Sequence, residues 1–110
     1  MITGYNFLVL MDFSESSYLA LKYAITIAKT IGGQIHVAHI SNPEEIVTTE
    51  NQRVGLNALK TEAEKINAKL SSIVEIIIAE NVQATYHYSI GNIIHETKNL
   101  ISEINSDLII

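Results

Sequence analysis

The chain has 110 residues, enough for one domain, and its 47% hydrophobic and 17% charged content favours a folded core over disorder. Its formal net charge of −5 offers no basic surface for DNA, RNA or an anionic membrane. It contains no cysteine, which excludes disulfides and thiol chemistry. The sequence has neither a basic signal peptide nor an apolar run of about 20 residues, so we expect a soluble, cytoplasmic protein.

The first predicted element is a strand over residues 7–11 (FLVLM), a continuous apolar run typical of a strand buried on both faces. Asp12 ends this run. Ser14 is expected to cap a helix that starts at Glu15, whose charge suits the positive N-terminal end of a helix. The apolar positions of this helix recur every three or four residues until Gly32. The strand therefore delivers a carboxylate to the carboxyl edge of the sheet, where ligands of open parallel sheets bind.

A strand and a long helix are predicted next. Residues 34–40 (QIHVAHI) are rich in β-branched side chains and precede Pro43, which indicates a second strand. The polar residues 44–51 are expected to form a loop or the irregular start of a helix. Residues 52–80 then predict an amphipathic helix, because apolar side chains recur at intervals of four and three: Leu59, Ala63, Ile66, Leu70, Ile73 and Ile77.

The last third of the chain predicts two more strands with a helix between them. Residues 82–89 (VQATYHYS) favour a third strand with its two tyrosines on one face and His87 on the other. A helix is expected over residues 92–104, followed by a fourth strand over 107–110 (DLII). The order βαβαβαβ is typical of an α/β domain with a doubly wound parallel sheet.

The arrangement of helices predicts an incomplete domain. Right-handed crossovers place the first two helices on one face of the sheet and the third, of about 14 residues, alone on the other. One helix is thin cover for four strands, so we expect at least one αβ unit to be missing after residue 110. Leu108, Ile109 and Ile110 would then form an open edge, and the thinly covered face would expose Ile and Val side chains. Both features favour a homo-oligomer.

Several catalytic and binding motifs are absent from the sequence. It contains no G-x-x-x-x-G-K-[ST], G-x-G-x-x-G or G-x-S-x-G. His36 and His39 lie three residues apart on a strand, so they should point to opposite faces and cannot share a metal ion. His87 and His95 have no histidine or carboxylate partner at ligand spacing. We therefore predict no catalytic residue and no metal site.

Asp12 is the residue most open to a functional interpretation. A carboxylate at the end of an apolar strand is costly unless something hydrogen-bonds to it. One interpretation is structural, in which Asp12 forms the turn before the helix. The other is functional, in which Asp12 accepts a hydrogen bond from a ribose hydroxyl or a similar ligand group.

Residues 7–40 resemble the opening of the universal stress protein family, in which a strand ending in an Asp-Phe-Ser run leads into the first helix. The pair His39-Ile40 at the end of the second strand fits this pattern. The turn at Gly91 and the final strand over 107–110 fit as well. The resemblance therefore spans the whole chain.

The resemblance implies a five-stranded, Rossmann-like parallel sheet, of the adenine nucleotide alpha hydrolase-like type, in which many members bind ATP beside the first strand. By position, Met11 would offer backbone contacts and Asp12 would take the ribose or adenine side. Ile40 would flank the adenine through its backbone, and Gly91 would lie near the pocket wall. Leu10 departs from the family pattern, because many members have proline there.

The family's phosphate-holding segment, Gly-x2-Gly-x9-Gly-Ser/Thr, follows its fourth strand, and this sequence ends before that point. Members also commonly dimerise through the fifth strand. The resemblance implies a regulatory, stress-response module that binds ATP or another nucleotide in its complete form, and we expect this 110-residue chain, which lacks the phosphate-holding segment, to bind ATP poorly. Two alternatives stay open: an interaction module of the same fold that works without nucleotide, and a slow ATPase or phosphotransferase. Since no side chain is placed as a nucleophile or base, we do not predict an enzyme.

Overall fold

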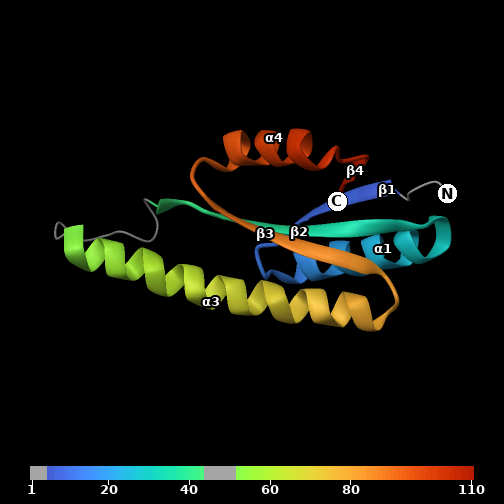
Figure 1. Cartoon of the computed structure of the whole chain (residues 1–110), viewed down its shortest axis with the longest axis horizontal. Helices are drawn as coiled ribbons and strands as arrows, with labels where there is room; N and C mark the ends of the chain where they lie inside the picture. Colours follow the sequence, from blue (N-terminus) through green and yellow to red (C-terminus); the bar gives the residue numbers. More distant parts are fainter. Residues whose placement is uncertain (1–4, 44–51) are drawn as a thin grey trace.

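A computed structural model of the chain describes residues 5–43 and 52–110, with side chains from residue 57 onward in the second range. The predicted order of elements is confirmed (Figure 1). The expected loop over residues 44–51 lies outside the described residues. The elements are β1 (Tyr5–Leu10), α1 (Glu15–Ile31), β2 (Gly33–Ser41), α3 (Gln52–Ala79), β3 (Gln83–Ile90), α4 (Ile93–Ile104) and β4 (Leu108–Ile109).

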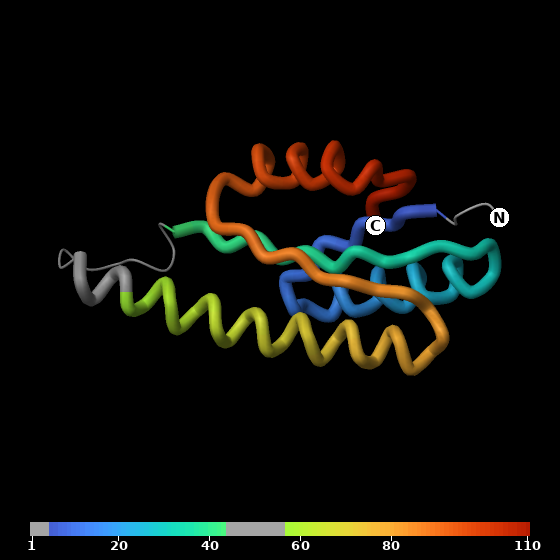
Figure 2. Tube along the Cα trace, viewed as in Figure 1, coloured from blue at the N-terminus to red at the C-terminus, as the bar shows by residue number. Residues whose placement is uncertain are grey.

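The four strands form one sheet in the order β3-β2-β1-β4, and each neighbouring pair is parallel. The predicted doubly wound α/β class is therefore confirmed. β1 and β2 are paired over their whole common length, with Phe7 beside Ile35 and Val9 beside Val37. β4 pairs with β1 over only two residues, so the chain ends beside β1 (Figure 2).

The helices are shared unequally between the two faces of the sheet, as the sequence predicts. α1 and α3 lie against one face, and α4 is the one described helix against the other (Figure 1). The face under α1 and α3 carries the larger core, because alternate residues of the strands turn their apolar side chains toward it. Its buried members are Phe7, Val9, Met11, Leu21, Ala24, Ala28, Ile35, Val37, Ile66, Leu70, Ile73, Ile77 and Val82.

The face under α4 differs from the expectation. Its apolar cluster is small, with Leu8, Ala38 and Leu100 buried. The expected exposure of Ile and Val from the sheet is found at β4, where Ile109 is 46% exposed. Toward β3 the expectation of exposed Ile and Val side chains is wrong. The strands there present polar side chains that hydrogen-bond to one another: Asn6, Gln34, His36 and His87.

Local capping explains why α1 and α4 begin and end where they do. Ser14 Oγ accepts a hydrogen bond from the backbone N–H of Ser17, and Gly32 ends α1 with a positive φ of 80°. Asn92 caps α4 in the same way at its start, and Asn105 ends it in the left-handed conformation. The predicted limits of α1 are therefore confirmed.

The differences from the predicted elements are small. β1 begins at Tyr5 and ends at Leu10, while β4 has two residues where four were expected. α3 (Gln52–Ala79) ends one residue before its predicted limit. Among the helices that the structure describes, none is both long and apolar enough to cross a membrane.

Candidate functional site

The turn after β1 is fixed to β2 through the backbone of Met11. The N–H of Met11 donates to the carbonyl of Ala38 at 2.7 Å, and its own carbonyl accepts a hydrogen bond from His39 Nδ1 at 2.7 Å. The side chain is buried, and its sulfur accepts from the Ser17 hydroxyl at 3.2 Å. A carbonyl has two lone pairs, so Met11 O retains one acceptor position. The predicted backbone contact from Met11 to a ligand stays a prediction.

Asp12 is exposed at the carboxyl edge of the sheet and forms the turn into α1. Its Oδ1 accepts hydrogen bonds from the hydroxyl of Ser14 and, at 2.9 Å, from the backbone N–H of Ser14. The hydroxyl bond, followed by the backbone bond, lowers the pKa of Asp12 below its ordinary value, so the group is ionised at neutral pH. The structural interpretation of Asp12 is thus realised. An ionised carboxylate has about four acceptor positions, which leaves room for a ligand hydroxyl as well.

Phe13 has a left-handed backbone, with a φ of 66° that is rare for a bulky side chain. Three contacts hold it there. Its ring lies 5.2 Å from the ring of His39 and 4.9 Å from Lys69 Nζ, and its N–H donates to Met11 Sδ at 3.4 Å. Strained residues of this kind gather at binding sites, because the surrounding structure must over-determine them. This conformation could not be inferred from the sequence, since no glycine marks the position.

Ile40 lies at the carboxyl end of β2, next to the turn that carries Asp12. Leu10 pairs with Ala38, so the next residues of the two strands arrive at the same edge. Ile40 is half-buried against the apolar cluster under α4. Its neighbour His39 faces the opposite side, where its ring stacks on that of Tyr88 at 6.1 Å. The structure therefore brings Met11, Asp12 and Ile40 to one edge, although their roles toward a ligand stay predictions.

Gly91 lies at the same carboxyl edge but at the end of β3, so β2 separates it from β1. Its N–H donates to the carbonyl of Ser41 at 2.9 Å. Two features explain why this position is a glycine. Its φ is 156°, and a Cβ atom on any other residue here would lie 3.2 Å from the side chain of Glu96. A place in the pocket wall stays a prediction for this residue.

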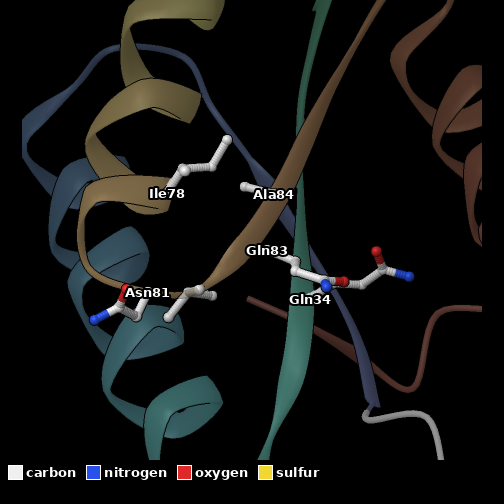
Figure 3. Close-up of a pocket in the computed structure, with 6 residues that line it drawn as sticks. Gln34, Ile78, Asn81, Gln83 and Ala84 are labelled. Atoms are coloured by element: carbon white, nitrogen blue, oxygen red, sulfur yellow. The ribbon is translucent and has the colours of Figure 1, made fainter.

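A cavity of about 500 Å³ lies at the opposite end of the sheet, near the starts of β2 and β3. Figure 3 shows Ile78 and Ala84 on the side of α3, whereas Gln34 and Gln83 extend to the other side of the strands. The polar groups of the lining therefore do not converge on one volume, as they do in a ligand site. The cavity is not a candidate site.

The histidines are arranged partly as predicted. His36 and His39 face opposite sides of the sheet, as their spacing requires. His87 has no histidine partner at ligand spacing in the sequence, but the fold brings one to it: His36 Nδ1 lies 3.0 Å from His87 Nε2. These residues are 51 positions apart and meet only because β2 pairs with β3. Within residues 5–43 and 52–110, no three His, Cys, Asp or Glu side chains are grouped to hold a metal ion.

Comparison with solved structures supports the fold. The chain is 17% identical to the hypothetical protein MJ0577, with a TM-score of 0.84 over 99% of this chain and 74% of that chain. Universal stress protein UspA from Lactobacillus plantarum gives 18% identity and a TM-score of 0.81 over 99% and 77%. A universal stress protein in complex with cAMP gives 18% and 0.67 over 98% and 72%.

A search among curated proteins returned no match. At the level of sequence, residues 5–110 match the profile of the Universal stress protein family. This range includes all seven described elements and the turn that carries Asp12. The chain belongs to the universal stress protein family.

Proposed function

We propose that this protein is a small regulatory module of the stress response that binds an adenine nucleotide at the carboxyl edge of β1 and β2. The chain leaves β1 toward the α1 face and reaches the adjacent β4 from the α4 face (Figure 1). In doubly wound proteins, ligands bind at the carboxyl ends of the strands beside such a reversal. One structural neighbour is described in complex with cAMP, which favours the same ligand class.

The observation that carries the proposal is the exposed, ionised carboxylate of Asp12 at this edge. A carboxylate in this position suits a ribose, because it can accept hydrogen bonds from adjacent hydroxyl groups. The backbone of Ile40, at the end of the neighbouring strand, would flank the base. Met11 would contribute the remaining acceptor position of its carbonyl.

The residues of this chain fit the nucleoside part of ATP better than its phosphates. None of the five glycines belongs to a Gly-x2-Gly-x9-Gly-Ser/Thr segment. The Ser14 hydroxyl donates to Asp12 and also accepts the Ser17 N–H as the cap of α1, so we assign it a structural role and the proposal includes no turnover.

Calorimetric titration with adenosine and ATP tests the proposal. Asp12→Ala should weaken nucleoside binding roughly tenfold to a hundredfold, the scale of a lost charged hydrogen bond. Asp12→Asn separates the two roles of the residue, because the amide oxygen can still accept from Ser14 and preserve the turn. It should fold like the parent and bind more weakly.

Glu15→Gln is the matched control, because it removes a neighbouring exposed charge from the first turn of α1. Its affinity should equal that of the parent. Equal affinities in the parent and in both Asp12 variants would overturn the role of Asp12. A well-folded parent that binds neither adenosine nor ATP would favour the nucleotide-independent interaction module instead.

The proposal also includes self-association. β4 has only one paired edge within the described sheet, and Leu108 and Ile109 are 43% and 46% exposed there. An exposed apolar edge strand pairs readily with another chain. A second copy of this protein is therefore the proposed partner at this edge.

A further inference from the structure

A pair of histidines joins β2 to β3 on the face of the sheet that α4 covers. His36 Nδ1 and His87 Nε2 are 3.0 Å apart, the ordinary length of a hydrogen bond between nitrogens. His36 is 8% exposed, and the registers of the two strands place His87 one position diagonal to it. The pair takes no part in the site at the carboxyl edge. The histidine of that site is His39, which donates a hydrogen bond to the carbonyl of Met11.

The neighbours of the pair determine which nitrogens carry hydrogen. Asn6 Oδ1 accepts from Gln34 Nε2 at 2.7 Å and also lies 3.3 Å from His36 Nε2. Because an amide oxygen only accepts, His36 Nε2 must be protonated, and neutral His36 then has a bare Nδ1. His87 Nε2 must therefore donate its hydrogen to His36 Nδ1. The chain of donors runs His87 to His36 to Asn6.

The geometry indicates a shared proton and not a shared metal ion. A metal ion bound by both rings would lie about 2.0–2.1 Å from each nitrogen. It would therefore sit to one side of the line that joins the two nitrogens, and both lone pairs would have to point toward it. The ring centroids are 5.2 Å apart. This is about the sum of the distance between the two nitrogens and the radii of the two rings, as expected when both nitrogens lie on the line between the centroids. The two nitrogens therefore face each other head on. Both rings would have to turn before a metal ion could bind.

The surroundings oppose positive charge on the pair. Burial lowers the pKa of His36, and the charge of a protonated His87 lowers it further. Burial also lowers the pKa of His87, while Glu103 on α4 acts in the opposite direction. From the turn before β4, Asp107 accepts a hydrogen bond from the backbone N–H of Asn6 and so holds the far end of the network.

We propose that His36 and His87 form a proton-operated clasp that fastens edge strand β3 to β2 beneath α4 at neutral pH and opens when both rings are protonated. β3 lies at the edge of the sheet, so β2 is its only partner strand among the described residues. Loss of the clasp removes a side-chain hydrogen bond between the two strands and loosens β3, while the core residues that β1 and β2 bury on the other face stay packed. Acidification is thereby coupled to loosening of the edge strand.

The two protons have different effects. The first binds to Nδ1 of His87, whose Nε2–H still donates to His36, so the hydrogen bond persists and becomes charge-assisted. The second must bind to Nδ1 of His36. Two N–H groups and two positive charges then face each other across 3.0 Å, and the bond is lost. Opening therefore follows the protonation of His36.

The sign of the pH dependence follows from the lowered pKa values. Above the ordinary histidine pKa of 6.5, both rings are neutral in the folded and unfolded chains, and the stability is complete. Below it, the histidines of the unfolded chain become protonated while those of the folded chain stay neutral, so the free energy of unfolding decreases as the pH falls. The loss levels off once the pH is below the pKa values of the folded state.

Nitrogen NMR of the imidazole rings tests the clasp in the unmodified protein. At neutral pH, His36 should be protonated at Nε2 alone, and it should titrate after His87. Amide-exchange protection factors at about pH 5 should fall in β3 but not in β1. Independent titration of both rings at the ordinary histidine value, or equal loss of protection in both strands, would overturn the proposal.

Denaturation at several pH values gives a second test. Between about pH 7.5 and about pH 5, the folding equilibrium constant of the parent should fall roughly fivefold, the scale of one lost hydrogen bond. The double variant His36→Gln/His87→Gln should lack this fall, because two amides can bond without titrating. His95→Gln, which removes an exposed histidine from α4, should behave like the parent. The same pH dependence in all three proteins would contradict the clasp.

Discussion

The two faces of the sheet are built from the same strands but are stabilised differently. The face under α1 and α3 is a continuous apolar core, whereas the face under α4 combines a small apolar cluster with a polar network. Apolar packing is non-directional and does not respond to pH, while a buried hydrogen bond between titratable groups depends on both geometry and charge. The comparison indicates that the face under α1 and α3 contributes most of the stability, whereas the face under α4 makes the stability depend on pH.

The comparison can be tested most strongly by removing the same side chain from each face. Leu70 on α3 is 0% exposed, and Leu100 on α4 is 5% exposed. Leu70→Ala should lower the free energy of unfolding by about 4–5 kcal/mol, and Leu100→Ala by about 2–3 kcal/mol, the upper and lower parts of the range for such truncations. Urea denaturation measures both. A larger loss for Leu100→Ala would reverse the assignment of the stabilising face.

A smaller effect is expected at β4, where the edge is proposed to contact a second copy. The side chain of Ile109 is 46% exposed, and its burial between two chains contributes about 1–2 kcal/mol. Ile109→Lys should therefore shift the protein toward the monomer in light scattering. Ile94→Lys is the matched control, because Ile94 is 64% exposed on α4 and away from that edge. A compact monomer at all concentrations of the parent would contradict self-association.

Local signals in the sequence predicted the elements well. Ser14 and Gly32 lie at the ends of α1 and act through hydrogen bonds to residues within four positions, so their effect can be inferred without the fold. The continuous apolar run of β1 likewise indicates burial on both faces. The alternation of tyrosine and histidine in β3 predicted correctly which face each side chain occupies.

Features that depend on strand register could not be predicted. The contact between His36 and His87 requires knowledge that β2 and β3 are adjacent and how they are aligned. The left-handed Phe13 is held by His39 and Lys69, which come from two other elements. The candidate site was located from Asp12, since a carboxylate after a buried strand is visible in one segment. Its turn geometry became apparent only with the structure.

The most direct test of the account is where adenosine contacts the chain, measured by amide chemical-shift changes during titration. The carboxyl edge and the cavity near Gln34 and Gln83 lie at opposite ends of the sheet, so the two outcomes are well separated. We predict that the largest changes fall on residues 11–14 and on Ile40. Changes centred on Gln34 and Gln83, with none at Asp12, would contradict the proposed site.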